Sequence, residues 1–197
     1  MSVRASKIRR MNANAARRTL ITVIAAALAP VAAAGAENTL VFDNVGGWAV
    51  KTDLNREYRC FVEADYDNGS AVRAGFNSDD GRFYISVSDF NWDWVEVGVD
   101  YAVALAFDEE PAQELAATGI VLETQFVQSG VLLHVPAELA DHVVSQFMYR
   151  NEMHLSYGEE ASLTLGLVGT QRATEALETC QTTMARSAES TELSQLR

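Results

Sequence analysis

Short runs of alternating apolar and polar residues dominate the chain beyond residue 46, and this alternation is typical of half-buried β-strands. One run carries Cys60 on its apolar side, together with Tyr58, Val62 and Ala64. Asp67-Asn68-Gly69 follows and predicts a tight hairpin turn, because asparagine and glycine tolerate positive φ angles. A later run places Phe83, Ile85 and Val87 on one side. The sequence therefore predicts a series of strands joined by short turns.

The longest alternation covers residues 95–107 and predicts either one long bent strand or two strands joined near 98–100. Further strands are predicted after Gly119, after Gly130, at 153–157 and at 162–167. Several short strands at regular spacing, separated by turn residues, are typical of a sandwich or a barrel.

Two segments instead follow the helical period. Pro136 suits the first turn of a helix, and the residues after it form one apolar face with Leu139, Ala140, Val143, Val144 and Phe147. The second helix is predicted to begin near Thr170 as N-cap, with an apolar stripe of Ala173, Ala176, Leu177, Cys180 and Met184. The predicted fold class is mainly β, an antiparallel β-sandwich or barrel with one internal helix and a C-terminal helix. Residues 37–184 form its single domain, and 185–197 a polar, disordered tail.

The first 36 residues differ from the rest of the chain. They hold six basic side chains and no acid, an apolar run at 20–29, and a small-residue stretch that ends in Ala34-Gly35-Ala36. This order is that of a cleavable signal peptide, and the apolar run is shorter than the roughly 20 residues that span a bilayer. A buried core helix, the alternative, would leave the basic flank unexplained. We therefore predict a periplasmic or secreted bacterial protein, with no membrane span in the mature chain.

Arg17-Arg18 resembles the twin-arginine export signature ahead of its apolar segment. Ala16 stands where serine or threonine is usual, and no lysine follows. The twin-arginine and the general secretory routes both stay open. If the chain instead begins at Met11, its signal peptide is shorter.

Cys60 and Cys180 are the two cysteines of the chain, and pairing is expected in an oxidising compartment. The strand period turns Cys60 inward, and the helical stripe turns Cys180 inward as well. Both thiols are therefore predicted to face one core and to form a structural disulfide. No CxxC pattern or third cysteine indicates redox catalysis or zinc binding.

The net charge of the chain limits the classes of partner that it can bind. Without the six basic residues of the signal, the chain keeps nine of its 15 basic residues against 27 acidic ones, a formal charge of −18. Nucleic acids and anionic membranes require a positive surface, so neither is an expected partner. An acidic surface favours solubility, cation association or a basic partner. Adaptation to a salty habitat is the simplest interpretation.

Motifs that carry known chemistry are missing from the sequence. It has no G-x-S-x-G elbow, phosphate-binding glycine loop or H-E-x-x-H helix. The segment that begins at Asp65 resembles the start of a calcium-binding loop, but Phe76 occupies the twelfth position, where such a loop has a bidentate glutamate. We therefore assign no catalytic, cofactor-binding or metal-binding residue. His134 and His154 lie on predicted strands and could face one another as a weak metal or acid/base site, whereas His142 falls on a polar helix face.

The segment 89–94 has the most unusual composition in the chain. Phe90, Trp92 and Trp94 alternate there with polar, mostly acidic residues, as an aromatic platform for a sugar ring or a cation requires. These three are the candidate ligand-binding residues. The competing interpretation is core packing, since aromatic residues dominate β cores. Trp92 is the residue that we expect to be exposed if the packing interpretation is wrong.

Gly46-Gly47-Trp48-Ala49-Val50, an early cysteine and a terminal helix with the second cysteine are similar to the invasion-associated locus B family of exported proteobacterial proteins. That family also begins its domain with a Gly-x-Trp-x-Val-like strand. Cys60 lies farther from Trp48 than the first cysteine of the family lies from its tryptophan. The resemblance implies no functional residues.

These observations favour a non-enzymatic envelope protein that binds an unidentified protein or small-molecule ligand, through an exposed aromatic or edge-strand surface. One alternative is a small periplasmic hydrolase that uses His134 or His154 with neighbouring carboxylates. It requires the two histidines to converge in a concave pocket with Asp or Glu within hydrogen-bond reach. Another is an acidic inhibitor of a basic enzyme, whose binding would depend steeply on salt.

Overall fold

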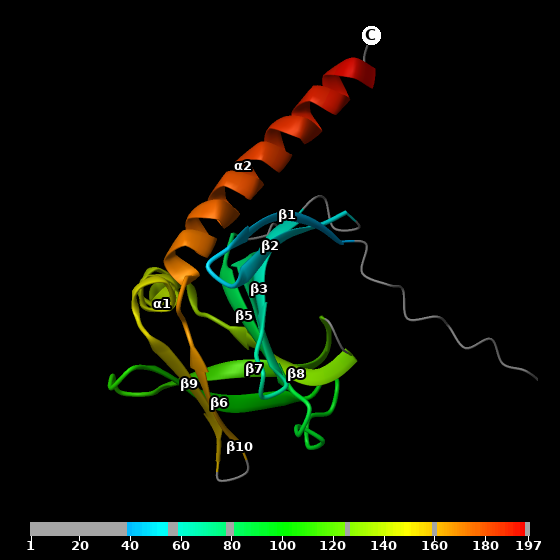
Figure 1. Cartoon of the computed structure of the whole chain (residues 1–197). Helices are drawn as coiled ribbons and strands as arrows, with labels where there is room; N and C mark the ends of the chain where they lie inside the picture. The colour runs from blue at the N-terminus through cyan, green and yellow to red at the C-terminus, as the bar shows by residue number, and fades with distance from the viewer. Residues whose placement is uncertain (1–38, 55–58, 78–80, 125–126, 159–160, 196–197) are drawn as a thin grey trace, which may run out of the picture. The chain divides into compact units, whose positions relative to one another are not determined.

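Ten strands form one antiparallel sheet in the part of the chain that the computed structural model describes, residues 39–54, 59–77, 81–124, 127–158 and 161–195. The predicted signal peptide lies outside these residues. The elements are β1 (Thr39–Val45), β2 (Trp48–Asp53), β3 (Arg59–Asp65), β4 (Ser70–Phe76), β5 (Phe83–Asp89), β6 (Asp100–Phe107), β7 (Gln113–Glu123), β8 (Val127–His134), α1 (Ala137–Tyr149), β9 (Glu152–Tyr157), β10 (Ala161–Gly166) and α2 (Thr170–Gln195). The predicted class, mainly antiparallel β with one internal and one C-terminal helix, is confirmed (Figure 1).

The strand order is β1-β2-β3-β4-β5-β8-β7-β6-β9-β10. The first five strands follow one another, and the Asp67-Asn68-Gly69 turn joins β3 to β4 as predicted, closed by the Tyr66 amide donating to the Ser70 carbonyl at 2.9 Å. The next three strands enter the sheet in reverse order, so β8 pairs with β5. No ladder joins β1 to β10 among the described residues, so the sheet is open rather than a closed barrel.

Two strand predictions need correction. Residues 95–99 form turns rather than strand, and β6 begins only at Asp100. Gly119 and Gly130 lie inside β7 and β8 rather than before them. A Cβ at Gly119 would collide with the Glu96 carbonyl oxygen, so glycine is needed there because the 95–99 turn passes close to the strand.

The core lies on one face of the curved sheet and includes residues of both helices. Phe147 of α1 is fully buried between Trp48 and Phe83, with ring centroids 5.5 and 5.8 Å away. Val143 is buried beside it, and Leu139, Ala140 and Val144 pack against the same cluster, so the predicted apolar face of α1 is confirmed. Burial of each large apolar side chain contributes about 1.5–3 kcal/mol.

Contacts between loops and strand ends, rather than strand pairing, bring the two ends of the sheet together. The Trp48 indole donates to the Val168 carbonyl at 3.2 Å, and the Tyr66 hydroxyl donates to the Gly166 carbonyl at 2.7 Å. Gly46, with φ +61°, touches the Gly169 backbone, and a Cβ on Gly46 would lie 2.9 Å from the Gly169 Cα. The sheet therefore curls around the core without a continuous ladder.

Helix α2 packs on β1, β2 and β3 (Figure 1). Its buried stripe of Ala173, Leu177 and Cys180 is the predicted one, and the Cys60–Cys180 disulfide is confirmed, with the two Cα atoms 6.1 Å apart. Two details differ from prediction. Thr170 is the first helical residue, and its hydroxyl donates to the Leu167 carbonyl instead of capping the helix. The helix continues to Gln195 through the predicted disordered tail, because that segment has no proline or glycine to end it.

The disulfide closes a loop of 120 residues. Replacing both Cys60 and Cys180 by serine should therefore lower the free energy of unfolding by about 5 kcal/mol, because the unfolded chain regains its loop entropy. Urea unfolding followed by circular dichroism measures this loss, and the reduced wild type should match the double variant. An unchanged unfolding midpoint would contradict the prediction.

Burial raises the pKa of the Tyr66 phenol above its ordinary value. The folded state therefore favours the protonated phenol, whose contribution to stability is complete below about pH 10 and is lost as the pH rises further. Between pH 9 and pH 11 the wild type should lose more unfolding free energy than Tyr66→Phe. Tyr149→Phe, at an exposed tyrosine, serves as the control and should behave like the wild type. Equal losses of unfolding free energy in the wild type and in Tyr66→Phe would contradict this role of the Tyr66 phenol.

Candidate functional site

The outer face of the sheet, opposite the core, carries two aligned rows of side chains across β3, β4, β5 and β8. Strand register places Glu63, Arg73, Ser86 and Leu132 in one row. The second row, two residues along each strand, contains Phe61, Gly75, Tyr84 and His134. Because alternate residues of a strand face the same side, these eight residues form one continuous patch.

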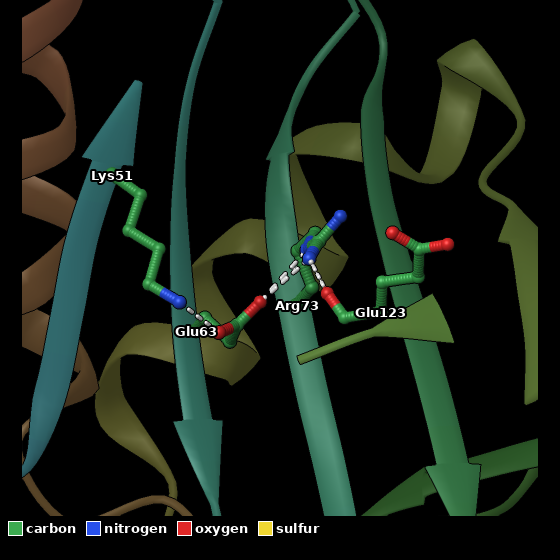
Figure 2. A network of polar contacts seen from close by, with 4 residues as sticks. All are labelled: Lys51, Glu63, Arg73 and Glu123. Atoms are coloured by element: carbon green, nitrogen blue, oxygen red, sulfur yellow. Dashed lines mark hydrogen bonds and ion pairs between the residues drawn. The ribbon is translucent and has the colours of Figure 1, made fainter. Parts of the chain in front are cut away.

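A buried carboxylate lies at one edge of this patch. The Glu63 side chain is only 2% exposed, and each of its oxygens meets a cation from a neighbouring strand (Figure 2). Lys51 of β2 donates to Oε1, and Arg73 of β4 donates to Oε2 through Nε at 3.0 Å and Nη2 at 2.7 Å. An ionised carboxylate withdrawn from water costs several kcal/mol unless it is paired, and the two cations supply that pairing.

Arg73 also joins parts of the sheet that are not neighbours. Its Nη2 donates to the Glu123 carbonyl at 2.7 Å, at the end of β7, although β5 and β8 lie between β4 and β7 in the sheet (Figure 2). Its guanidinium lies over the Phe61 ring, 4.4 Å from the centroid, a favourable cation–π contact. The end of β7 is therefore folded over the outer face, which explains why the outward-facing Leu122 is buried.

A cavity of about 390 Å³ lies on this face, a size within the usual range for small-molecule sites. Its apolar lining includes Phe61, Ile120, Leu122 and Leu132. Its polar lining consists of Asp53, Arg73, Asn77, Arg82, Tyr84, Ser86 and His134. This mixture of an apolar wall with a few polar groups is typical of a site that orients a small ligand.

The histidines do not converge. His134 lines the cavity, and its Nε2 lies 2.8 Å from the Thr118 hydroxyl, which donates to Asp100 at 2.9 Å. Since the Thr118 proton is directed to Asp100, Nε2 is assigned as the donor to Thr118. His154 lies on β9 beside the Thr164 hydroxyl at 2.9 Å, and β7 and β6 separate it from β8.

Neither His142 nor a cluster of metal-ligating side chains forms a second candidate site in the part of the chain that the structure describes. His142 is exposed on α1 with Nε2 3.8 Å from Glu110 Oε2. Among the described residues, no group of three or more His, Cys, Asp or Glu side chains is placed to hold a metal ion. The convergence that the hydrolase alternative requires is therefore not present between His134 and His154.

The aromatic segment lies away from the cavity. Trp92 is 7% exposed and belongs to the core, and Trp94 stacks on Tyr157 with centroids 4.7 Å apart. Core packing accounts for these two tryptophans. Phe90 is 53% exposed and lies against Gly69. A ligand-binding role for Phe90, Trp92 and Trp94 stays a prediction.

An exposed edge strand is also present, as the binding interpretation predicts. Strand β1 lies at the end of the sheet order and exposes three consecutive apolar side chains, Leu40, Val41 and Phe42.

Among the residues that line the cavity, only His134 is a candidate from the sequence, and the buried ion pairs were not predicted. A local signal for one pair existed, because Glu63 and Arg73 are equidistant from the turn at Asn68 and so must face each other in the hairpin. Their burial had no local signal, since it depends on the end of β7 crossing this face.

No known family model and no curated protein matches the chain in sequence. Its structure is similar to the crystal structure of invasion associated protein B from Bartonella henselae, with a TM-score of 0.51 and 15% identity. The match covers 73% of this chain and 99% of that one. This likeness confirms the predicted resemblance at the level of the fold. None of the helices in the described residues is both long and apolar enough to span a membrane.

Glu63→Gln keeps the shape of the side chain but leaves two cations without their counterion. We expect a loss of about 3 kcal/mol in unfolding free energy, the usual cost of breaking a buried pair. Urea unfolding followed by tryptophan fluorescence measures it. Glu109→Gln makes the same change at an exposed turn and should alter stability by less than about 0.5 kcal/mol. Similar effects of the two substitutions would show that the Glu63 network contributes little.

Proposed function

We propose that this protein is an exported, non-enzymatic binding module of the bacterial cell envelope that holds a small ligand in the outer-face cavity. The observation that carries this proposal is the cavity itself, about 390 Å³ with mixed polar and apolar lining. A buried ion-pair network fixes one of its walls, so the site exists before any ligand arrives. Preformed sites bind with less loss of conformational entropy than sites that must be ordered.

Export is supported by the disulfide and by the signal-like composition of residues 1–36. A bond between Cys60 and Cys180 persists in oxidising compartments such as the periplasm and is rare in the cytosol. The structural likeness to a protein described as invasion associated is compatible with export of this chain.

Binding is favoured over hydrolysis by the surroundings of His134. A general base requires an orienting carboxylate or a nucleophile within hydrogen-bond reach. His134 does contact a hydroxyl, that of Thr118, but the proton of this hydroxyl is directed to Asp100, so His134 donates to Thr118 rather than accepting its proton. The inhibitor alternative rests on overall acidity alone.

The native mass spectrum of the protein recovered from the periplasm of its own host tests this proposal. We expect a chain without residues 1–36, two hydrogens lighter than the reduced form, carrying a non-covalent small-molecule adduct. Leu132→Trp fills the cavity from its floor and should lose the adduct. Val97→Trp places the same side chain on an exposed turn and should keep it.

Three results would contradict the proposal. An uncleaved, reduced chain would exclude export. A bare wild-type monomer would remove the support for a resident ligand, and an adduct that survives in Leu132→Trp would place the ligand elsewhere.

A further inference from the structure

Strand β1 leaves one backbone edge of the sheet open. It stands first in the strand order and pairs with β2, and no second strand pairs with it among the described residues. The N–H and C=O groups along such an edge point away from the sheet, where they can pair with a further strand. The turn at Gly46, which follows β1, touches the Gly169 backbone. Residues 39–42, at the other end of β1, are therefore the part of the edge farthest from that contact.

This half of β1 exposes apolar side chains on both faces of the sheet. Leu40, Val41 and Phe42 are 55%, 57% and 36% exposed. Leu40 lies opposite Thr52, which is buried on the core side. Val41 lies opposite Lys51, which belongs to the ion pairs of the outer face. Edge strands are commonly protected against pairing by charged side chains, and these three positions carry none.

A strand added to this edge would meet an apolar side chain on each face. Successive residues of a strand alternate between the two faces, so a matching segment is apolar at consecutive positions rather than at every second one. The register shift between Val41 and Asp43 is a bulge that bends β1, and it centres the pairing on residues 39–42. Main-chain hydrogen bonds then supply affinity, and the side chains opposite Leu40 and Val41 supply specificity. A short extended polypeptide fits such an edge better than a small molecule does.

The charge of the chain favours a basic partner over a second copy. Residues 37–197 contain nine basic and 27 acidic residues, a formal charge of −18. Within β1, Asp43 is the charged residue, and no lysine or arginine is present. Lys51, on the neighbouring strand, is held by Glu63. A second copy would bring a like charge to the edge, whereas a segment with lysine or arginine is attracted to it.

We propose that residues 39–42 of β1 bind an extended segment of another protein, which is apolar at consecutive positions, is flanked by lysine or arginine, and adds to the sheet as a further strand. Such a partner pairs with the open backbone edge, covers Leu40 and Val41 on their two faces, and complements the acidic charge. The lining of the outer-face cavity contains no residue of β1. The two binding surfaces are therefore distinct, and either proposal can fail without the other.

Three synthetic peptides test this assignment. The basic probe has the sequence Lys-Lys-Thr-Val-Ile-Val-Thr-Lys-Lys, and the acidic probe has glutamate in place of each lysine. The third probe is the basic peptide with an N-methyl group on each amide of its central stretch, which removes the main-chain donors and keeps the side chains. Fluorescence anisotropy of the labelled peptides with the mature, oxidised protein at low salt should show the basic probe binding at least about tenfold more tightly than the other two. Added salt should weaken its binding.

Substitutions in the protein test the location. Val41→Glu removes the apolar side chain from the edge while adding a charge that attracts the basic probe. It should still reduce the affinity for that probe at least about tenfold, because the apolar cross-strand contact is lost and a charge on an edge strand opposes pairing. Val97→Glu makes the same change on an exposed turn and should keep the wild-type affinity. Leu132→Trp, which fills the cavity, should keep it as well. Circular dichroism of each variant checks that it is folded.

Four outcomes would overturn this inference. If the basic probe does not bind, or binds no more tightly than its N-methylated form, main-chain pairing at the edge is not the mode of binding. Equal affinity for the acidic probe would exclude a basic partner. Unchanged binding in Val41→Glu would place the peptide elsewhere on the protein. Wild-type dimers in sedimentation velocity that are lost in Val41→Glu would make a second copy the occupant of the edge.

Discussion

The buried carboxylate of Glu63 is the constraint on which the outer face depends. Its side chain is 2% exposed on the side of the sheet away from the core, so its charge requires partners that also leave water. Lys51 and Arg73 provide them, and Arg73 also donates through Nη2 to the Glu123 carbonyl. One charge pair thereby fixes the end of β7 above the rest of the sheet. The cavity wall follows from that contact.

The two faces of the sheet are stabilised by different means. On the inner face, apolar packing around Phe147, the Cys60–Cys180 bond and the turn contacts at Gly46 close the core. On the outer face, charge pairing and a cation–π contact support an open cavity. A ligand on the outer face therefore need not disturb the core. This separation suits a binding module whose core packs without help from a ligand.

Structural features that depend on the spacing of nearby residues could be predicted from the sequence. The inward orientation of the two cysteines, the apolar face of α1 and the Asp67-Asn68-Gly69 turn follow from patterns of residues a few positions apart, and the structure confirms all three. Features that depend on distant segments could not. The 95–99 turn and the interior position of Gly119 result from a close backbone approach that alternation does not reveal. The cavity arises in the same way, so His134 was its only member among the candidate residues named from the sequence.

Amide chemical-shift mapping tests most directly whether ligands enter the outer-face cavity. The ¹⁵N-labelled mature protein would be titrated with the small molecule released from the protein of its own host and followed by two-dimensional NMR. The largest shifts should lie in the three segments that line the cavity, at 82–86, 120–122 and 132–135. Shifts concentrated instead along β1, or around the exposed Phe90, would place the binding surface elsewhere and contradict ligand entry into the cavity.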